Sequence, residues 1–183
     1  RLFGPDPASS NVTTMGGVIS IDGAGSHWLK YGSARRHVMS LQVVLADGEI
    51  MEVGREPLRD GASQDPNPRK RELVDRLARL LRERDNLIRR HQPKSPVNRC
   101  GYHLLDALGD EHLDLARLLV GSEGTLALIT EAEVAIQPLP RHRGMSLLLF
   151  DSLEKAARAV PEILSHGPSV CDLMDRRHLT LAR

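Results

Sequence analysis

Two glycine-rich turns are the residues of this chain whose type and spacing could support ligand chemistry. The first is Thr14-Met15-Gly16-Gly17, and the second, much later in the chain, is Gly121-Ser122-Glu123-Gly124-Thr125. Each turn precedes apolar residues, so each can direct main-chain N–H groups at an anion or at polar ring edges. Neither matches the G-x-G-x-x-G fingerprint or the P-loop, which argues against a doubly wound nucleotide fold. The turns suit a large cofactor rich in acceptors, a pyrophosphate or a flavin, although surface turns without a ligand are a common alternative.

Other catalytic constellations are sparse. The eight histidines are scattered, and none pairs at the i, i+4 spacing of a metal-binding helix. His103, Asp106, Asp110 and His112 gather in a polar stretch, which favours a solvated cluster over a metal site. The sequence therefore assigns no catalytic residue and no metal ligand.

Composition sets limits on the class of protein. With 183 residues, 40% of them hydrophobic and 27% charged, the chain has globular proportions. A formal net charge of +1 favours neither nucleic acid nor an anionic membrane, and no apolar run reaches the roughly 18 residues of a membrane span. Cys100 and Cys171 cannot form a disulfide framework, which predicts a reducing, cytoplasmic setting, and Cys100 is interpreted as a small buried residue. Because residues 1–7 contain neither an initiator Met nor a signal core, a larger protein is expected.

The elements that must position the first turn are a small-residue tract and a hairpin. Within the tract, at 4–32, residues 15–21 are expected to form a short apolar turn or strand. Residues 38–53 predict a β-hairpin, because Asp47-Gly48 separates two β-rich runs.

A long excursion follows the hairpin. A polar, Pro-rich loop at 55–68 leads to an amphipathic helix from Arg69 to His91, whose apolar stripe comprises Leu73, Leu77, Leu80, Leu81, Leu87 and Ile88. Residues 69–90 carry nine Lys/Arg against four Asp/Glu, so a nucleic-acid-binding helix is one hypothesis. A surface helix with one face docked is favoured, because acidic residues are interspersed and no aromatic residue accompanies them.

The last segment contains the second turn. A short helix is expected at 113–119, and alternation over 125–137 predicts a long strand or bent strand pair. Pro138 and Pro140 interrupt the pattern, after which a strand at 145–150, a helix at 153–165 and a new strand near Ser169 are expected. This change predicts a domain boundary, with domains at 1–140 and 141–183.

Several spaced motifs, taken together, resemble one family. They are Gly4-Pro5-Asp6-Pro7, Thr14-Met15-Gly16-Gly17, Gly23-Ala24-Gly25-Ser26, Leu29-Lys30-Tyr31-Gly32, Ala46-Asp47-Gly48-Glu49 and Gly121-Ser122-Glu123-Gly124-Thr125-Leu126. In this order they resemble the FAD-linked oxidases of the vanillyl-alcohol oxidase (PCMH) type. The branch is that of glycolate oxidase D subunits and of D-lactate and D-2-hydroxyglutarate dehydrogenases. Asn98-Arg99-Cys100-Gly101-Tyr102 and the preceding basic helix resemble the subgroup fused to an iron–sulfur module.

The resemblance implies an α+β fold. Residues 1–140 would form the second subdomain of a PCMH-type FAD-binding domain, a mainly antiparallel sheet with flanking helices and a helical excursion at 55–96. Residues 141–183 would begin an α+β substrate-binding cap. The chain would thus be a fragment, and the fragment alone is expected to be inactive.

The implied function is oxidation of a small 2-hydroxy acid, such as D-lactate, glycolate or 2-hydroxyglutarate, by hydride transfer to FAD. The electrons would leave to an acceptor, any iron–sulfur cluster would lie outside this segment, and neither a nucleic-acid partner nor an integral membrane segment is expected. A different reaction on the same FAD fold is the alternative within enzymes.

The resemblance also implies which residues contact FAD, and the central expectation is that the two glycine turns converge on one cofactor. Ile21-Asp22 replaces a pair often occupied by Asn, and Ala127 replaces a frequent Gly. The implied contacts are Pro7, Ala8, Ser9, Ser10, Asn11, Val12, Thr13, Thr14, Gly16, Gly17, Ser20, Gly23, Ala24, Gly25, Glu123, Gly124, Thr125, Leu126 and Ile129.

Overall fold

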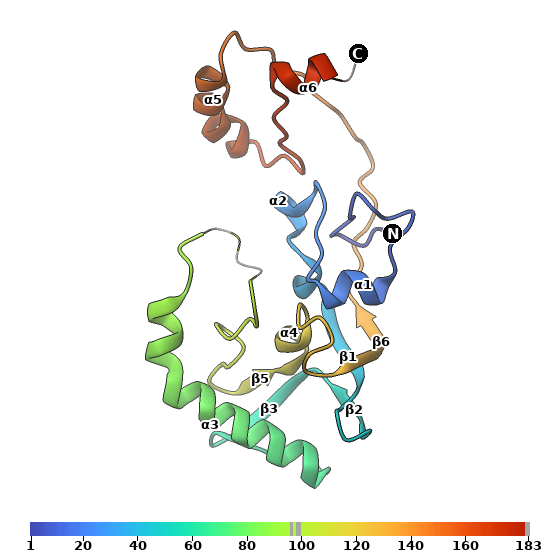
Figure 1. Ribbon diagram of the computed structural model, residues 1–183, viewed down its shortest axis with the longest axis vertical. Coiled ribbons are helices and arrows are strands. Elements are labelled where there is room, and N and C mark those ends of the chain that lie inside the picture. The colour runs from blue at the N-terminus through green and yellow to red at the C-terminus, as the bar shows by residue number, and fades with distance from the viewer. Residues whose placement is uncertain (96, 98–99, 182–183) are drawn as a thin grey trace.

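The computed structural model describes residues 1–95, 97 and 100–181. These residues contain two three-stranded antiparallel sheets (Figure 1). The first sheet has the order β2-β1-β6 and the second the order β4-β3-β5. The strands are β1 (Val38–Val44), β2 (Ile50–Val53), β3 (Arg55–Arg59), β4 (Ala62–Ser63), β5 (His112–Asp114) and β6 (Leu128–Val134). The helices are α1 (Met15–Ser20), α2 (Trp28–Tyr31), the 3-10 turn η1 (Ala34–Arg36), α3 (Pro68–His91), α4 (Leu115–Leu119), α5 (Leu153–Ser165) and α6 (Arg176–Leu181). The predicted α+β class with mainly antiparallel sheets is confirmed.

The hairpin predicted at 38–53 is confirmed. Strand β1 pairs with β2, with Leu41 opposite Val53, and Gly48 turns the chain at a φ of 86°. On its other side β1 pairs with β6, with Val43 opposite Ile129. The strand predicted in 125–137 is therefore present as β6. It begins shortly after the second glycine turn, so this turn lies next to the β2-β1-β6 sheet, whose first strand comes after the first glycine turn in the chain.

The polar loop predicted at 55–68 is wrong, because this segment contains β3 and β4. Asp60 and Gly61 adopt left-handed φ angles of 51° and 81° and close a hairpin between the two strands. Strand β3 also pairs with β5, with Glu56 opposite Leu113. Buried Glu56 stands where an apolar residue would have revealed the alternation. Strand β5 takes residues 112–114, so the helix predicted at 113–119 begins at Leu115.

Helix α3 matches the predicted helix, and Asn67 caps it by accepting the N–H of Arg69 at 2.9 Å. Its docked face is centred on Val74, Ala78 and Leu81, which are buried at i, i+4 and i+7. Leu80 and Leu87 are each 51% exposed, so the predicted stripe is wrong at these positions. Val74, Ala78 and Leu81 make the contact of α3, while Leu80 and Leu87 lie at its exposed edge.

A partly buried cation joins α3 to the second sheet. The ammonium of Lys70 lies 2.9 Å from Glu56 Oε2 and 3.1 Å from Asp65 Oδ2. The other oxygen of Glu56 accepts the N–H of Gly54 at 2.7 Å. Burial alone would lower the pKa of Lys70, but its hydrogen bonds to the two carboxylates outweigh burial and raise this pKa.

We expect Lys70→Met to lower the free energy of unfolding by about 2 to 3 kcal/mol, because buried Glu56 loses its countercharge. Urea denaturation of the chain measures this change. Lys155→Met is the matched control, since Lys155 pairs with Asp151 at an exposed site, and it should have a much smaller effect. Equal effects of the two substitutions would contradict the structural role of Lys70.

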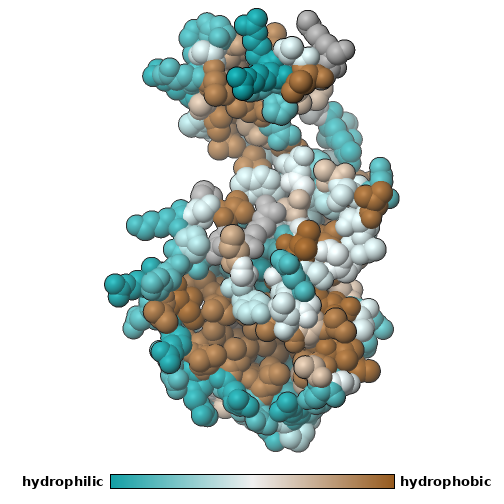
Figure 2. All heavy atoms as spheres, in the orientation of Figure 1, coloured by the Kyte–Doolittle hydropathy of each residue, from teal (hydrophilic) through white to brown (hydrophobic). Residues whose placement is uncertain are grey.

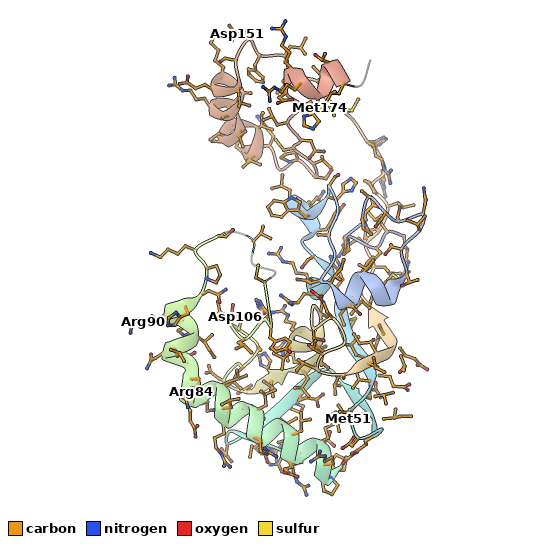
Figure 3. The ribbon with its side chains drawn as sticks, in the orientation of Figure 1. Met51, Arg84, Arg90, Asp106, Asp151 and Met174 are labelled. Carbon is orange, nitrogen blue, oxygen red and sulfur yellow. The ribbon has the colours of Figure 1, made fainter. Side chains whose placement is uncertain are left out.

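The helix predicted at 153–165 is confirmed as α5, with Ser152 accepting the N–H of Lys155 at 3.2 Å. The strands predicted at 145–150 and from Ser169 are wrong. Met145 and Leu149 are 96% and 85% exposed, and no described strand pairs with either segment. A strand forms only where a partner satisfies its N–H and C=O groups. Figures 1, 2 and 3 show the segment that carries α5 and α6 as a separate lobe, and in Figure 1 an extended segment joins it to the sheets.

Candidate functional site

The first glycine turn is the start of a short helix. Residues 15–20 form α1, so the predicted turn or strand at 15–21 is wrong. The hydroxyl of Thr14 accepts the N–H of Gly17 at 3.0 Å, which is an N-cap. Two adjacent glycines disfavour a helix by propensity, and this cap together with burial of Val18 and Ile19 overrides that preference.

The second glycine turn connects α4 to β6 and follows a left-handed path. Gly121, Glu123 and Gly124 have φ angles of 84°, 52° and 75°. A positive φ is unfavourable for Glu123, whose side chain has a Cβ, so the surrounding contacts hold this conformation in place. Backbone N–H groups in turn conformations can offer neighbouring donors to an anion.

The two turns meet. The N–H of Gly121 donates to the carbonyl of Ile19, and the N–H of Glu123 donates to the carbonyl of Ser20, each at 3.0 Å. The second turn is therefore hydrogen-bonded to the end of α1. Buried Ile19 and Val120 also place both turns on one apolar core.

Both turns retain donors and free space. In the part of the chain that the structure describes, the N–H groups of Gly16, Gly124 and Leu126 donate to no protein acceptor. A Cβ added at Gly16 would meet no atom within 4 Å, and one at Gly124 would meet only Leu128 Cδ2, at 3.9 Å. Unused donors beside open glycine backbone fit a ligand that presents acceptors.

The remaining predicted contacts lie on either side of α1. The loop from Pro7 to Thr13 precedes it and is open to solvent, with Val12 87% exposed. The loop at 23–25 follows it and is packed, because the N–H of Gly25 donates to the carbonyl of Pro5 at 2.7 Å. Ile129 lies in β6, where it pairs with Val43 of β1, and its partly buried side chain packs against the core.

Sequence reasoning missed a buried ion pair beside the turns. Asp22 is 1% exposed and Arg35 is 7% exposed, and Arg35 Nη1 lies 3.2 Å from Asp22 Oδ2. Asp22 Oδ1 also accepts the N–H of Arg35 at 2.9 Å. The sequence did not reveal that Asp22 pairs with Arg35, because two residues thirteen positions apart carry no local signal of a contact between them.

The loop after α3 also reaches the second turn. The hydroxyl of Tyr102 lies 2.9 Å from Thr125 Oγ1. Asn98 and Arg99 of the motif at 98–102 lie outside the described residues. Cys100 is exposed, so the prediction of a buried cysteine is wrong. The loop around it lies at the surface, with Gly101 and Tyr102 also exposed.

Two protein-family models match parts of this chain. Residues 1–54 match the family model described as "FAD binding domain", and residues 139–183 match "FAD linked oxidases, C-terminal domain". The first match contains α1 and Arg35. The chain belongs to the FAD-linked oxidases.

Curated relatives of this FAD-linked oxidase carry related names. A D-2-hydroxyglutarate dehydrogenase of Pantoea ananatis is 36% identical over 186 residues, which cover 100% of this chain and 18% of the relative. A glycolate oxidase subunit GlcD of Bacillus subtilis is 30% identical, with 96% of this chain and 27% of the relative covered. A D-lactate dehydrogenase of Archaeoglobus fulgidus is also 30% identical, with coverages of 96% and 28%. The chain thus spans 18% to 28% of the length of these relatives.

The family assignment confirms FAD as the expected cofactor of this FAD-linked oxidase. The individual FAD contacts and the domain boundaries stay predictions. Within the described ranges no three His, Cys, Asp or Glu side chains are grouped as a metal would need, and His103, Asp106, Asp110 and His112 form no such group. None of the helices described has both the length and the apolar character required to cross a bilayer.

His103 is expected to make the folding stability of the protein depend on pH. Burial, followed by the charge of Arg35, lowers the pKa of His103 below its ordinary 6.5. As the pH falls below 6.5, the unfolded chain binds a proton that the folded chain does not, so stability decreases through the lower folded pKa. We expect urea midpoints measured near pH 7.5 and pH 5.5 to differ less in His103→Gln than in the wild type. His142→Gln, at an exposed site, should keep the wild-type difference, and an unchanged difference in His103→Gln would contradict the assignment.

Proposed function

We propose that the protein oxidises a small 2-hydroxy acid by hydride transfer to FAD, and that the two glycine turns hold this FAD. The observation that carries the proposal is the junction of the turns, with unused N–H groups on both of them. The names of the relatives, which refer to 2-hydroxyglutarate, lactate and glycolate, support the substrate class. When bound, FAD supplies the hydride acceptor.

The residues of this chain bind and orient the cofactor in the proposal. Main-chain donors at Gly16, Gly124 and Leu126 offer hydrogen bonds to the acceptor groups of FAD without adding charge. The left-handed path at Glu123 and Gly124 fixes the direction of the second set of donors before the ligand arrives. In the same turn, the hydroxyl of Thr125 is hydrogen-bonded to the hydroxyl of Tyr102, which lies in the loop after α3.

Groups that act on the substrate itself are not assigned to this chain. We propose that these groups, and any iron–sulfur cluster, lie in regions of the full-length protein that correspond to the parts of the relatives outside the match with this chain. The identity of the 2-hydroxy acid, the electron acceptor and the reducing cytoplasmic setting likewise stay predictions, as do the domains at 1–140 and 141–183.

A glycine substitution tests the site without disturbing the fold. Gly16 lies in the first turn of α1, where alanine is the better helix former and its Cβ meets open space. We expect Gly16→Ala to leave the melting temperature unchanged or slightly raised. FAD affinity should fall about tenfold or more, because the added methyl group occupies the position proposed for the cofactor.

The measurement is a titration of the flavin-depleted full-length gene product with FAD, followed by fluorescence. Gly144→Ala provides a matched control, since its Cβ also meets no atom within 4 Å and it lies outside the proposed site. Wild-type FAD affinity in Gly16→Ala would contradict the placement of the cofactor against α1.

A further inference from the structure

We propose that Arg35, together with Asp22, is the positioning residue for the FAD turn. In this inference, which rests on the proposed function, Arg35 fixes the carbonyl of Val120 and so sets the left-handed path of the backbone at 121–124. Arg35 was not among the FAD contacts that the family resemblance implies.

A single side chain links the two glycine turns. Asp22 follows the end of α1, and its carboxylate holds both the backbone N–H and the Nη1 of Arg35. The other terminal nitrogen of Arg35, Nη2, donates to the carbonyl of Val120 at 2.6 Å, directly before the second turn. A guanidinium can make these two contacts at once because its donors form a rigid planar fork.

The second turn packs directly on this ion pair. A Cβ added at Gly121 would lie 2.8 Å from Arg35 Nη2 and 3.2 Å from Asp22 Cβ, and the φ of Gly121 is 84°. Because the backbone is in contact with the guanidinium, a displacement of Arg35 must move the turn. The hydrogen bonds from Gly121 to Ile19 and from Glu123 to Ser20 carry this displacement to α1.

The contacts of Arg35 compensate only part of the free-energy cost of burying its charge, which favours a positioning role over a purely stabilising one. Its Nε is buried and has no hydrogen-bond partner among the described residues. Burial lowers the pKa of Arg35, and the charge of Asp22 offsets only part of this shift. A buried charge with an unsatisfied donor is unusual in a native structure and calls for a functional explanation.

The test is Arg35→Lys in the full-length gene product. Lysine keeps the charge opposite Asp22, but its ammonium cannot reproduce the two-sided fork. We expect FAD Kd to rise about tenfold or more and the visible circular dichroism of bound flavin to change, because misplacement of a preorganised site weakens binding. Arg36→Lys, at the exposed neighbouring arginine, should change neither quantity.

The outcomes separate the inference from the proposed function. A lower melting temperature in Arg35→Lys with unchanged FAD Kd and flavin dichroism would show that Arg35 is only structural and would overturn the inference. If Arg35→Lys does not fold, the uncharged pair Arg35→Met with Asp22→Asn replaces it and must show the same loss of FAD affinity. A wild-type protein that binds no FAD would instead overturn the proposed function, and the inference with it.

Discussion

Replacing Gly25 by alanine is expected to lower the free energy of unfolding by about 3 kcal/mol and to abolish FAD binding. An added Cβ would overlap the carbonyl oxygen of Asp6 and lie 2.7 Å from its carbonyl carbon. Both atoms belong to the backbone, which cannot move aside as a flexible side chain can. The substitution must therefore separate the segment at 5–6 from the loop after α1 and break the hydrogen bond from Gly25 to Pro5.

Urea denaturation of Gly25→Ala measures this effect, and Gly144→Ala serves as its control because no atom lies within 4 Å of the added methyl group. A change in the urea midpoint of equal size in both variants would show that close packing at Gly25 is not the cause. Full FAD binding by Gly25→Ala would show that the loop at 23–25 is not needed for the cofactor site.

The second large effect is expected at Asp22. Asp22→Ala removes the countercharge of buried Arg35 and the acceptor of its backbone N–H. Breaking a buried ion pair in this way costs about 3 to 5 kcal/mol, because the remaining charge has no compensation. We therefore expect Asp22→Ala to unfold at a much lower urea concentration than the wild type.

Asp22→Asn distinguishes charge from hydrogen bonding. Its amide oxygen can still accept the N–H of Arg35, so we expect a smaller loss of stability than in Asp22→Ala. Asp47→Ala is the surface comparison, because the pair between Asp47 and Arg69 is exposed. A urea midpoint for Asp22→Ala close to that of Asp47→Ala would contradict the role assigned to the buried pair.

Elements with strong local signals were predictable from the sequence. The Asp47-Gly48 turn identified the first hairpin, and helical periodicity identified α3 and α5. The hairpin of β3 and β4 was missed because buried Glu56 interrupts the apolar alternation, and its burial depends on Lys70, which lies on another element. The apolar run at 145–150 has strand character, yet no described strand pairs with it.

The candidate site was predictable to a similar degree. Glycine spacing and the family resemblance singled out both turns, and the structure joins them through Ile19 and Ser20. The side chains that set their geometry could not be found in this way. Arg35 reaches Val120, 85 residues away, and Tyr102 reaches Thr125 from the end of a long excursion. Such contacts arise from tertiary packing and leave no periodic trace in a single sequence.

Hydrogen exchange measured by mass spectrometry, with and without FAD, tests the central proposal most directly. The flavin-depleted full-length gene product would be compared with its FAD complex over peptides covering residues 14–20 and 121–126. The proposal predicts that FAD slows amide exchange in both peptides, because donors on both turns are engaged by one ligand. Bound flavin with unchanged exchange in either peptide would contradict it.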